Sequence, residues 1–101
     1  MANSIERKFC LGQILITPGA IQALQDAGQT PREFLLRHVS GDWGDICPED
    51  KELNDAAIAE EGNPDAQSRV LSAYTTKRGE QIWIISEWDR SATTILLPEE
   101  Y

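Results

Sequence analysis

Two Thr-Pro pairs set where the first half of this chain can form helices. Thr17 and Thr30 can each cap a helix, and the proline after each suits the first helical position, where a missing N–H costs no hydrogen bond. Glu33 adds the spacing of a capping box to the second pair. Gly28 and Gly41 are typical helix-ending residues. The sequence therefore predicts two short helices that end at these glycines and meet at a tight corner.

Strand and helix patterns flank this pair of helices. The stretch 9–17 (FCLGQILIT) is apolar and rich in branched residues, which predicts a strand with a bulge at Gly12. A third, acidic helix is expected after the corner, with Leu53, Ala57 and Ile58 as its only apolar anchors. So few anchors predict a helix that is loosely held and strongly solvated.

From residue 69 onward the hydrophobic period is two. This alternation predicts strands over 69–76, 81–88 and 92–97, with a hairpin turn at 77–79 and a stop at Pro98. The element order is thus β-α-α-α-β-β-β. Helices followed by a meander indicate an α+β fold, an antiparallel sheet with helices packed on one face. We expect a flexible tail over residues 1–8 and a single domain over 9–101.

The start of the chain lacks the apolar run of a secretory signal, and no stretch is long enough to span a membrane. A cytoplasmic location is therefore expected, and Cys10 and Cys47 are expected to be reduced thiols rather than a disulfide. Their spacing fits no zinc pattern, and the single histidine, His38, does not complete one. We expect neither a metal nor a cofactor.

The chain is acidic, and its charge is concentrated in one segment. Between Asp42 and Asp65 nine acids face a single base, Lys51, which equals the net charge of −8 of the whole chain. Such a segment repels phosphate and argues against direct nucleic-acid binding. We interpret it as a surface for a protein partner, with seven candidate binding residues: Asp42, Trp43, Asp45, Glu49, Asp50, Glu52 and Asp55. Plain solvation of the surface is the competing interpretation.

Catalytic candidates are few. His38 is followed closely by Asp42 and Asp45, which allows a general base held by a carboxylate. The alternative is that these polar residues cap local backbone and that Trp43 fills the core. His38 could also join Glu87, Arg90 and Thr94 across helix and sheet, as the acid–base groups of a small metal-independent ribonuclease do.

Three stretches of the chain are distinctive together: LGQILITPGA (11–20), FLLRHVSGDWG (34–44) and IWIISEWDRSATTILLPEEY (82–101). In these stretches the chain resembles a family of small bacterial proteins carried on plasmids and integrated mobile elements. The family is described as plasmid-related and has no established activity, so the resemblance carries over no functional residue. This chain departs from the family around 59–67, where the segment before the meander is longer.

Three hypotheses follow. The first is an acidic accessory domain of a mobile element that binds the basic surface of a nucleic-acid-processing protein. The second is the ribonuclease-like toxin that uses His38 and Arg90. The third is a homodimeric structural or regulatory subunit, in contact through an edge strand and an exposed Trp43 or Trp88.

Overall fold

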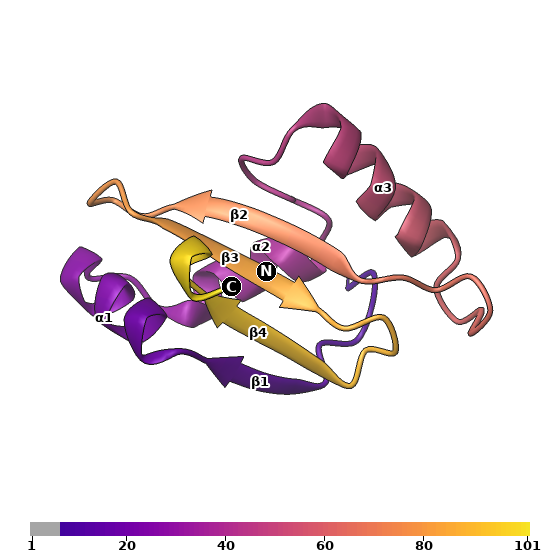
Figure 1. The fold of residues 1–101 in the computed structure, drawn as a ribbon, viewed down its shortest axis with the longest axis horizontal. Coiled ribbons are helices and arrows are strands. Elements are labelled where there is room, and N and C mark those ends of the chain that lie inside the picture. The colour runs from indigo at the N-terminus through magenta and orange to yellow at the C-terminus, as the bar shows by residue number, and fades with distance from the viewer. Residues whose placement is uncertain (1–6) are drawn as a thin grey trace, which may run out of the picture.

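The computed structural model describes residues 7–101, so most of the predicted tail lies outside the described residues. Its elements follow the predicted order: β1 (Gln13–Ile16), α1 (Pro18–Ala27), α2 (Pro31–Val39), α3 (Pro48–Ala59), β2 (Val70–Thr75), β3 (Gln81–Ser86), β4 (Ala92–Leu96) and the 3-10 turn η1 (Pro98–Glu100). The α+β fold class is therefore confirmed (Figure 1). In the described part of the chain, no helix is long and apolar enough to cross a membrane.

The sheet has the strand order β1-β4-β3-β2 and is mixed, not wholly antiparallel as predicted. β2, β3 and β4 form the antiparallel meander, whereas β1 pairs with β4 in parallel. A tight hairpin forces an antiparallel pair only between consecutive strands. β1 is separated from β4 by three helices and two strands, so its direction is set by how the helices return the chain.

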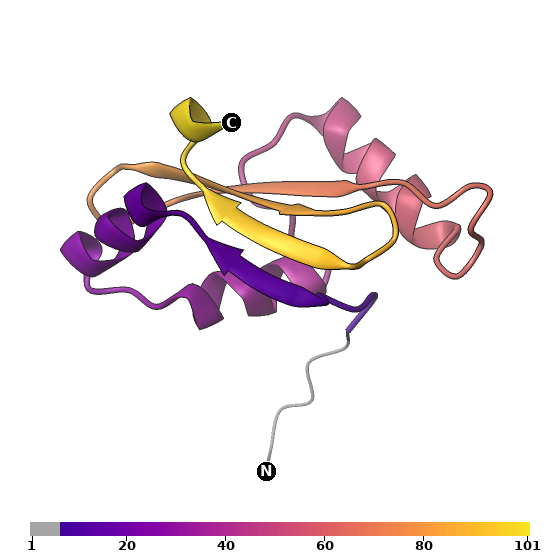
Figure 2. The same cartoon turned by 60° about the horizontal axis from the view of Figure 1, so that its bottom comes forward.

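The two faces of the sheet differ. α1 and α2 pack beneath one face, as predicted, and the core there contains Leu24 and Phe34 from the helices with Tyr74, Ile84 and Ile95 from the strands (Figure 2). The opposite face has η1 over it and α3 beside it at the β2 edge, and we call it the open face (Figure 2). By alternation it carries the half-buried Leu71, Trp83 and Thr94, together with Ile85 and Leu96, which are buried on this face.

The first strand is shorter than predicted because the chain turns before it. Gly12 has φ +65°, and a Cβ built there would lie 2.4 Å from the carbonyl oxygen of Arg90. Pairing with β4 therefore begins only at Gln13. Phe9 leaves the sheet plane and is buried in a second core cluster with Trp43, Ala57 and Val70. The backbone N–H of Lys8 donates to the carbonyl of Val39 at 2.9 Å, so this residue of the predicted flexible tail is held by the fold.

α3 lies along the outer edge of β2 and not on the helical face (Figure 1). Asn54 closes this edge: its amide donates to the carbonyl of Leu71 at 2.7 Å and its carbonyl accepts the Leu71 N–H at 3.2 Å. Ala57 is buried as predicted, but Leu53 points outward and is 67% exposed. The residue that anchors α3 beside Ala57 is thus a polar one, which an apolar-periodicity search does not find.

Candidate functional site

His38 lies between two strands' hydroxyl groups in the core. Its Nδ1 is 2.6 Å from Ser72 Oγ and its Nε2 is 3.0 Å from Ser86 Oγ. Ser86 Oγ is 2.6 Å from Thr93 Oγ1, which donates to the carbonyl of Leu11 at 2.7 Å. Because that carbonyl can only accept, Thr93 must accept from Ser86, and Ser86 from His38 Nε2–H. In the neutral imidazole the proton is therefore on Nε2, and Nδ1 accepts from Ser72.

The surroundings of His38 keep it neutral. The residue is fully buried, and the rings of Phe9 and Trp43 meet it edge-on with centroids 5.2 and 5.8 Å away. Burial, aided by the positive charge of Arg90, lowers the pKa of His38 from 6.5 to about 3. A base that is fully buried and already hydrogen-bonded at both nitrogens is out of reach of a substrate.

Stability should depend on pH through His38. Its pKa is lower in the folded protein than in the unfolded chain, so its contribution is complete above pH 6.5 and is lost as the pH falls toward 3. We expect the free energy of unfolding to fall by about 1 kcal/mol per pH unit in this window. Urea titrations of the wild type and of His38→Asn measure the effect. The variant should show a shallower slope between about pH 6.5 and 5; parallel curves would contradict the assignment.

Arg90 is also buried, at 7% exposure, although it sits in a turn with φ +60°. Its guanidinium pairs with Glu61 at 2.8 Å and donates to the carbonyls of Ser68 and Glu87 at 2.7 and 2.8 Å. Its Cζ lies 5.3 Å above the ring of Phe9. The hydrogen bonds of this guanidinium thus join the loop after α3, through Glu61 and Ser68, to the β3–β4 turn.

The four catalytic candidates do not face one another, contrary to the prediction. His38 and Arg90 are buried on the helical side, whereas Glu87 and Thr94 line a hollow on the open face with Tyr101. Side chains alternate between faces along a strand, so Thr94 points away from the side on which its neighbour Thr93 joins the His38 network. No single substrate atom can therefore contact all four side chains, so the structure does not bring together the acid–base groups that the ribonuclease-like hypothesis needs.

Besides Glu61, which pairs with Arg90, three of the nine acids in the 42–65 segment bond to side chains elsewhere in the fold. Asp42 pairs with Arg37 at 2.7 Å, and this hydrogen bond lowers the pKa of Asp42. Asp45 accepts the hydroxyl of Thr75 at 2.9 Å, next to the point where the loop pairs with β2. Asp55 accepts the indole N–H of Trp43 at 2.9 Å.

Trp43 is 4% exposed and so cannot make the first contact with a partner, contrary to its place among the predicted binding residues. Its ring is buried in the core against Phe9, Ala57 of α3 and Val70 of β2, as the competing interpretation expected.

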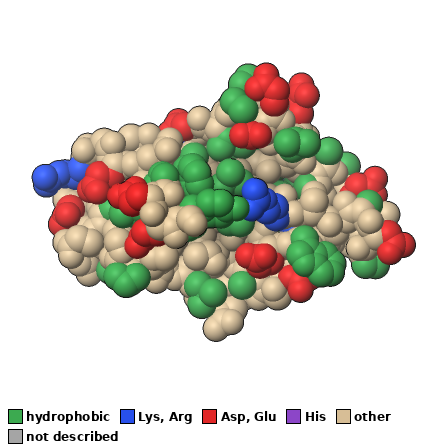
Figure 3. Space-filling model, in the orientation of Figure 1, with side chains coloured by type: hydrophobic (Ala, Val, Ile, Leu, Met, Phe, Trp, Pro, Cys, Tyr) green, Lys and Arg blue, Asp and Glu red, His purple; other side chains and the backbone are tan. Residues whose placement is uncertain are grey.

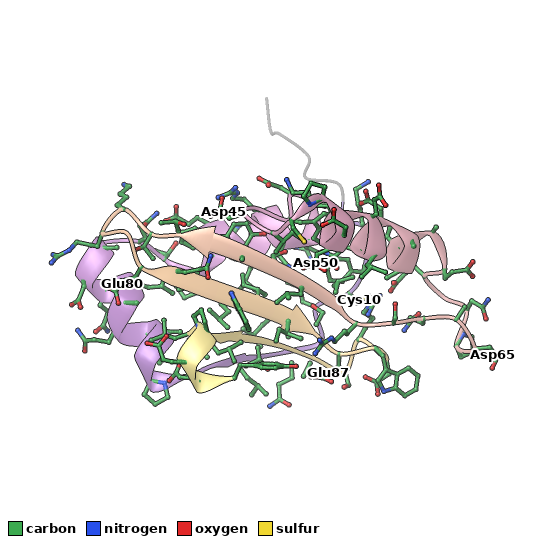
Figure 4. The ribbon with its side chains drawn as sticks, turned by 45° about the horizontal axis from the view of Figure 1, so that its top comes forward. Cys10, Asp45, Asp50, Asp65, Glu80 and Glu87 are labelled. Carbon is green, nitrogen blue, oxygen red and sulfur yellow. The ribbon has the colours of Figure 1, made fainter. Side chains whose placement is uncertain are left out.

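The remaining acids face solvent from α3 and from the loop after it. Among the described residues none of them has an ion-pair partner; they are Glu49, Asp50, Glu52, Glu60 and Asp65. Asp50 lies near the N-terminal end of α3, and Asp65 lies at the tip of the loop beyond its other end (Figure 4). No group of three His, Cys, Asp or Glu side chains in residues 7–101 could hold a metal ion. Both cysteines are free and exposed.

An apolar patch adjoins these acids on the open face. Space-filling shows hydrophobic side chains gathered over the middle of the sheet, with acidic side chains around the rim and a basic one beside the patch (Figure 3). A hollow between α3 and β2 is lined by Asp50, Leu53 and Leu71 together with Arg69. Arg69 donates to the hydroxyl of Tyr101 at 2.7 Å. Leu53 stands at this junction between the acidic helix and the apolar patch.

Comparisons with known protein families, with curated proteins and with solved structures found no match to this chain. Sequence reasoning missed Leu53 as an exposed residue and Glu61 as the partner of Arg90. The polar Asn54, three residues before Ala57 on the inner stripe of α3, was the one available signal that this helix is turned differently.

Proposed function

We propose that this chain is a protein-binding domain that engages a basic surface of its partner through α3. The observation that carries the proposal is Leu53, which is 67% exposed on a helix whose outer side carries several acids and one base, Lys51. A single exposed leucine is common on protein surfaces, but Leu53 also lines the hollow with Leu71 beside the apolar patch of the open face. An apolar side chain ringed by charge is the usual composition of an interface, with an anchor at the centre and a polar rim.

The charges define the kind of partner. Glu49 and Glu52 are three residues apart in the first turns of α3 and so lie on one face of the helix, and Asp50 adds a third negative charge at the same end. Lysines and arginines that contact phosphates would meet carboxylates here in a comparable way. We propose a partner that processes nucleic acid in the cytoplasm. On a mobile element, which the sequence resemblance suggests, such a partner would be a host enzyme.

Reversal of the three carboxylates at the start of α3 that have no ion-pair partner in the described residues should abolish partner binding with the fold retained. The variant is Glu49→Lys, Asp50→Lys, Glu52→Lys, and it spares Asp42, Asp45 and Asp55, which hold the fold. We expect recovery of a stoichiometric basic partner, in affinity purification from host cells with mass spectrometry, to fall at least about tenfold. Raised salt should weaken the wild-type complex in the same way.

A matched variant separates local from overall charge. Asp26→Lys, Glu80→Lys, Glu99→Lys changes the net charge equally at exposed acids on other elements and should retain the partner. Circular dichroism and urea unfolding check that both triple variants fold. Equal loss in both would show that only the net charge matters, and equal retention would exclude α3 as the binding surface.

A further inference from the structure

The two edge strands of the sheet, β2 and β1, differ in whether their outward backbone groups are hydrogen-bonded. At β2 the edge is closed: Asn54 bonds Leu71, and the loop at 43–45 bonds Ala73, whose N–H donates to Trp43 at 3.2 Å and whose carbonyl accepts from Asp45 at 2.7 Å. At β1 nothing in the described residues lies beyond the strand (Figure 1). Gln13 and Thr17 donate toward β4 at 3.0 Å each, so by alternation the backbone groups of Ile14 and Ile16 point away from the sheet.

β1 is short, with four residues that lie between Gly12 and Pro18, but it lacks the charged side chains that normally protect an edge strand. Natural edges carry charges or prolines that prevent pairing with another chain. Here no charged residue occurs anywhere from Phe9 to Gln25. Ile14 and Leu15 are 39% and 43% exposed, one on each face of the sheet. β1 is therefore an apolar, uncharged edge on a chain that is otherwise strongly negative.

We propose that β1 pairs with β1 of a second copy of this chain, antiparallel, to form one continuous eight-stranded sheet. Two molecules of net charge −8 repel each other, and this repulsion is smallest at the uncharged stretch around β1. The strand itself points to a second copy, because Ile14-Leu15-Ile16 reads the same in both directions about Leu15. A two-fold axis makes the contact self-complementary, as closed dimers require.

The geometry selects one register. Only the pairing of Ile14 with the second copy's Ile16 satisfies both outward-pointing residues of each strand, which gives four main-chain hydrogen bonds. Shifting it in either direction brings Gly12, with φ +65°, or Pro18, which has no N–H, into the ladder. In the selected register Leu15 lies opposite its own counterpart at a non-hydrogen-bonded position, where side chains approach most closely. The exposed Ile14 then packs beside the other copy's Ile16.

Light scattering after gel filtration tests the dimer with purified protein. We expect the mass to rise with concentration from 11.3 kDa toward twice that value. Leu15→Lys should keep the protein monomeric, because it places two like charges opposite each other at the axis. Leu53→Lys makes the same chemical change at a more exposed leucine on α3 and should still dimerise. Urea unfolding of each variant confirms that it is folded.

Cross-linking tests the register independently. In a Cys10→Ser, Cys47→Ser background, Leu15→Cys should form a disulfide-linked dimer under mild oxidation, whereas Leu53→Cys should not. A wild type that is monomeric at every concentration overturns the proposal, including the case in which β1 instead takes up a peptide of another protein. A dimer that survives Leu15→Lys and does not cross-link at position 15 overturns it as well. Neither result bears on the α3 surface, which the charge-reversal variants test.

Discussion

Arg90→Ala should lower the free energy of unfolding by about 3–5 kcal/mol, a large part of the roughly 5–15 kcal/mol expected for a domain of this size. The substitution removes a buried guanidinium that satisfies Glu61 and two backbone carbonyls and lies over Phe9. Those partners would remain in place without a donor, which is the costly way to lose a buried network. Urea unfolding followed by tryptophan fluorescence measures the change.

Two companion variants separate the causes. Arg90→Gly frees the backbone at φ +60° and should be less destabilised than Arg90→Ala, since the same side chain is lost but the left-handed conformation costs nothing. Arg90→Lys keeps the charge but cannot reproduce the forked hydrogen bonds, and it should lie between wild type and alanine. If Arg90→Ala costs less than about 1 kcal/mol, the buried network described here is not what joins the loop to the turn.

Gly44→Ala should be comparably damaging. Gly44 has φ +77°, and a Cβ there would lie 2.0 Å from the carbonyl oxygen of Ala73 and 2.7 Å from the ring of Tyr74. Both neighbours are in the sheet and cannot move aside. We expect a loss of about 3–5 kcal/mol, the sum of the left-handed penalty and of overpacking. Because the loop at 43–45 closes the edge of β2, its displacement should also increase aggregation on heating.

Gly79→Ala provides the matched control. Its φ is +86°, close to that of Gly44, but no atom lies within 4 Å of the added Cβ. It should therefore pay only the conformational penalty, about 1–2 kcal/mol. The difference between the two alanine variants in urea midpoint isolates the steric contact with β2. Equal losses would mean that the loop tolerates displacement from the strand edge.

Counting charges along the sequence predicts only part of the candidate surface. The sequence located the acidic segment correctly, but it could not separate acids that hold the fold from acids that face solvent. Asp55 and Glu49 look alike in the sequence, yet one accepts the indole N–H of Trp43 and the other has no ion-pair partner among the described residues. That distinction depends on which side of α3 meets the sheet. Leu53 and Asn54 settle it, because the polar residue is buried and the apolar one is exposed.

The sequence by itself determined the local elements. Thr-Pro starts and glycine ends placed α1 and α2 within one or two residues, and the change to a period of two placed the meander, because capping, turn conformation and side-chain alternation act between residues near in the chain. Only the tertiary structure decided the parallel direction of β1, the burial of His38 and Arg90, and the outward face of α3. These depend on contacts between residues far apart in the chain, such as His38 with Ser72 and Ser86, which no local pattern records.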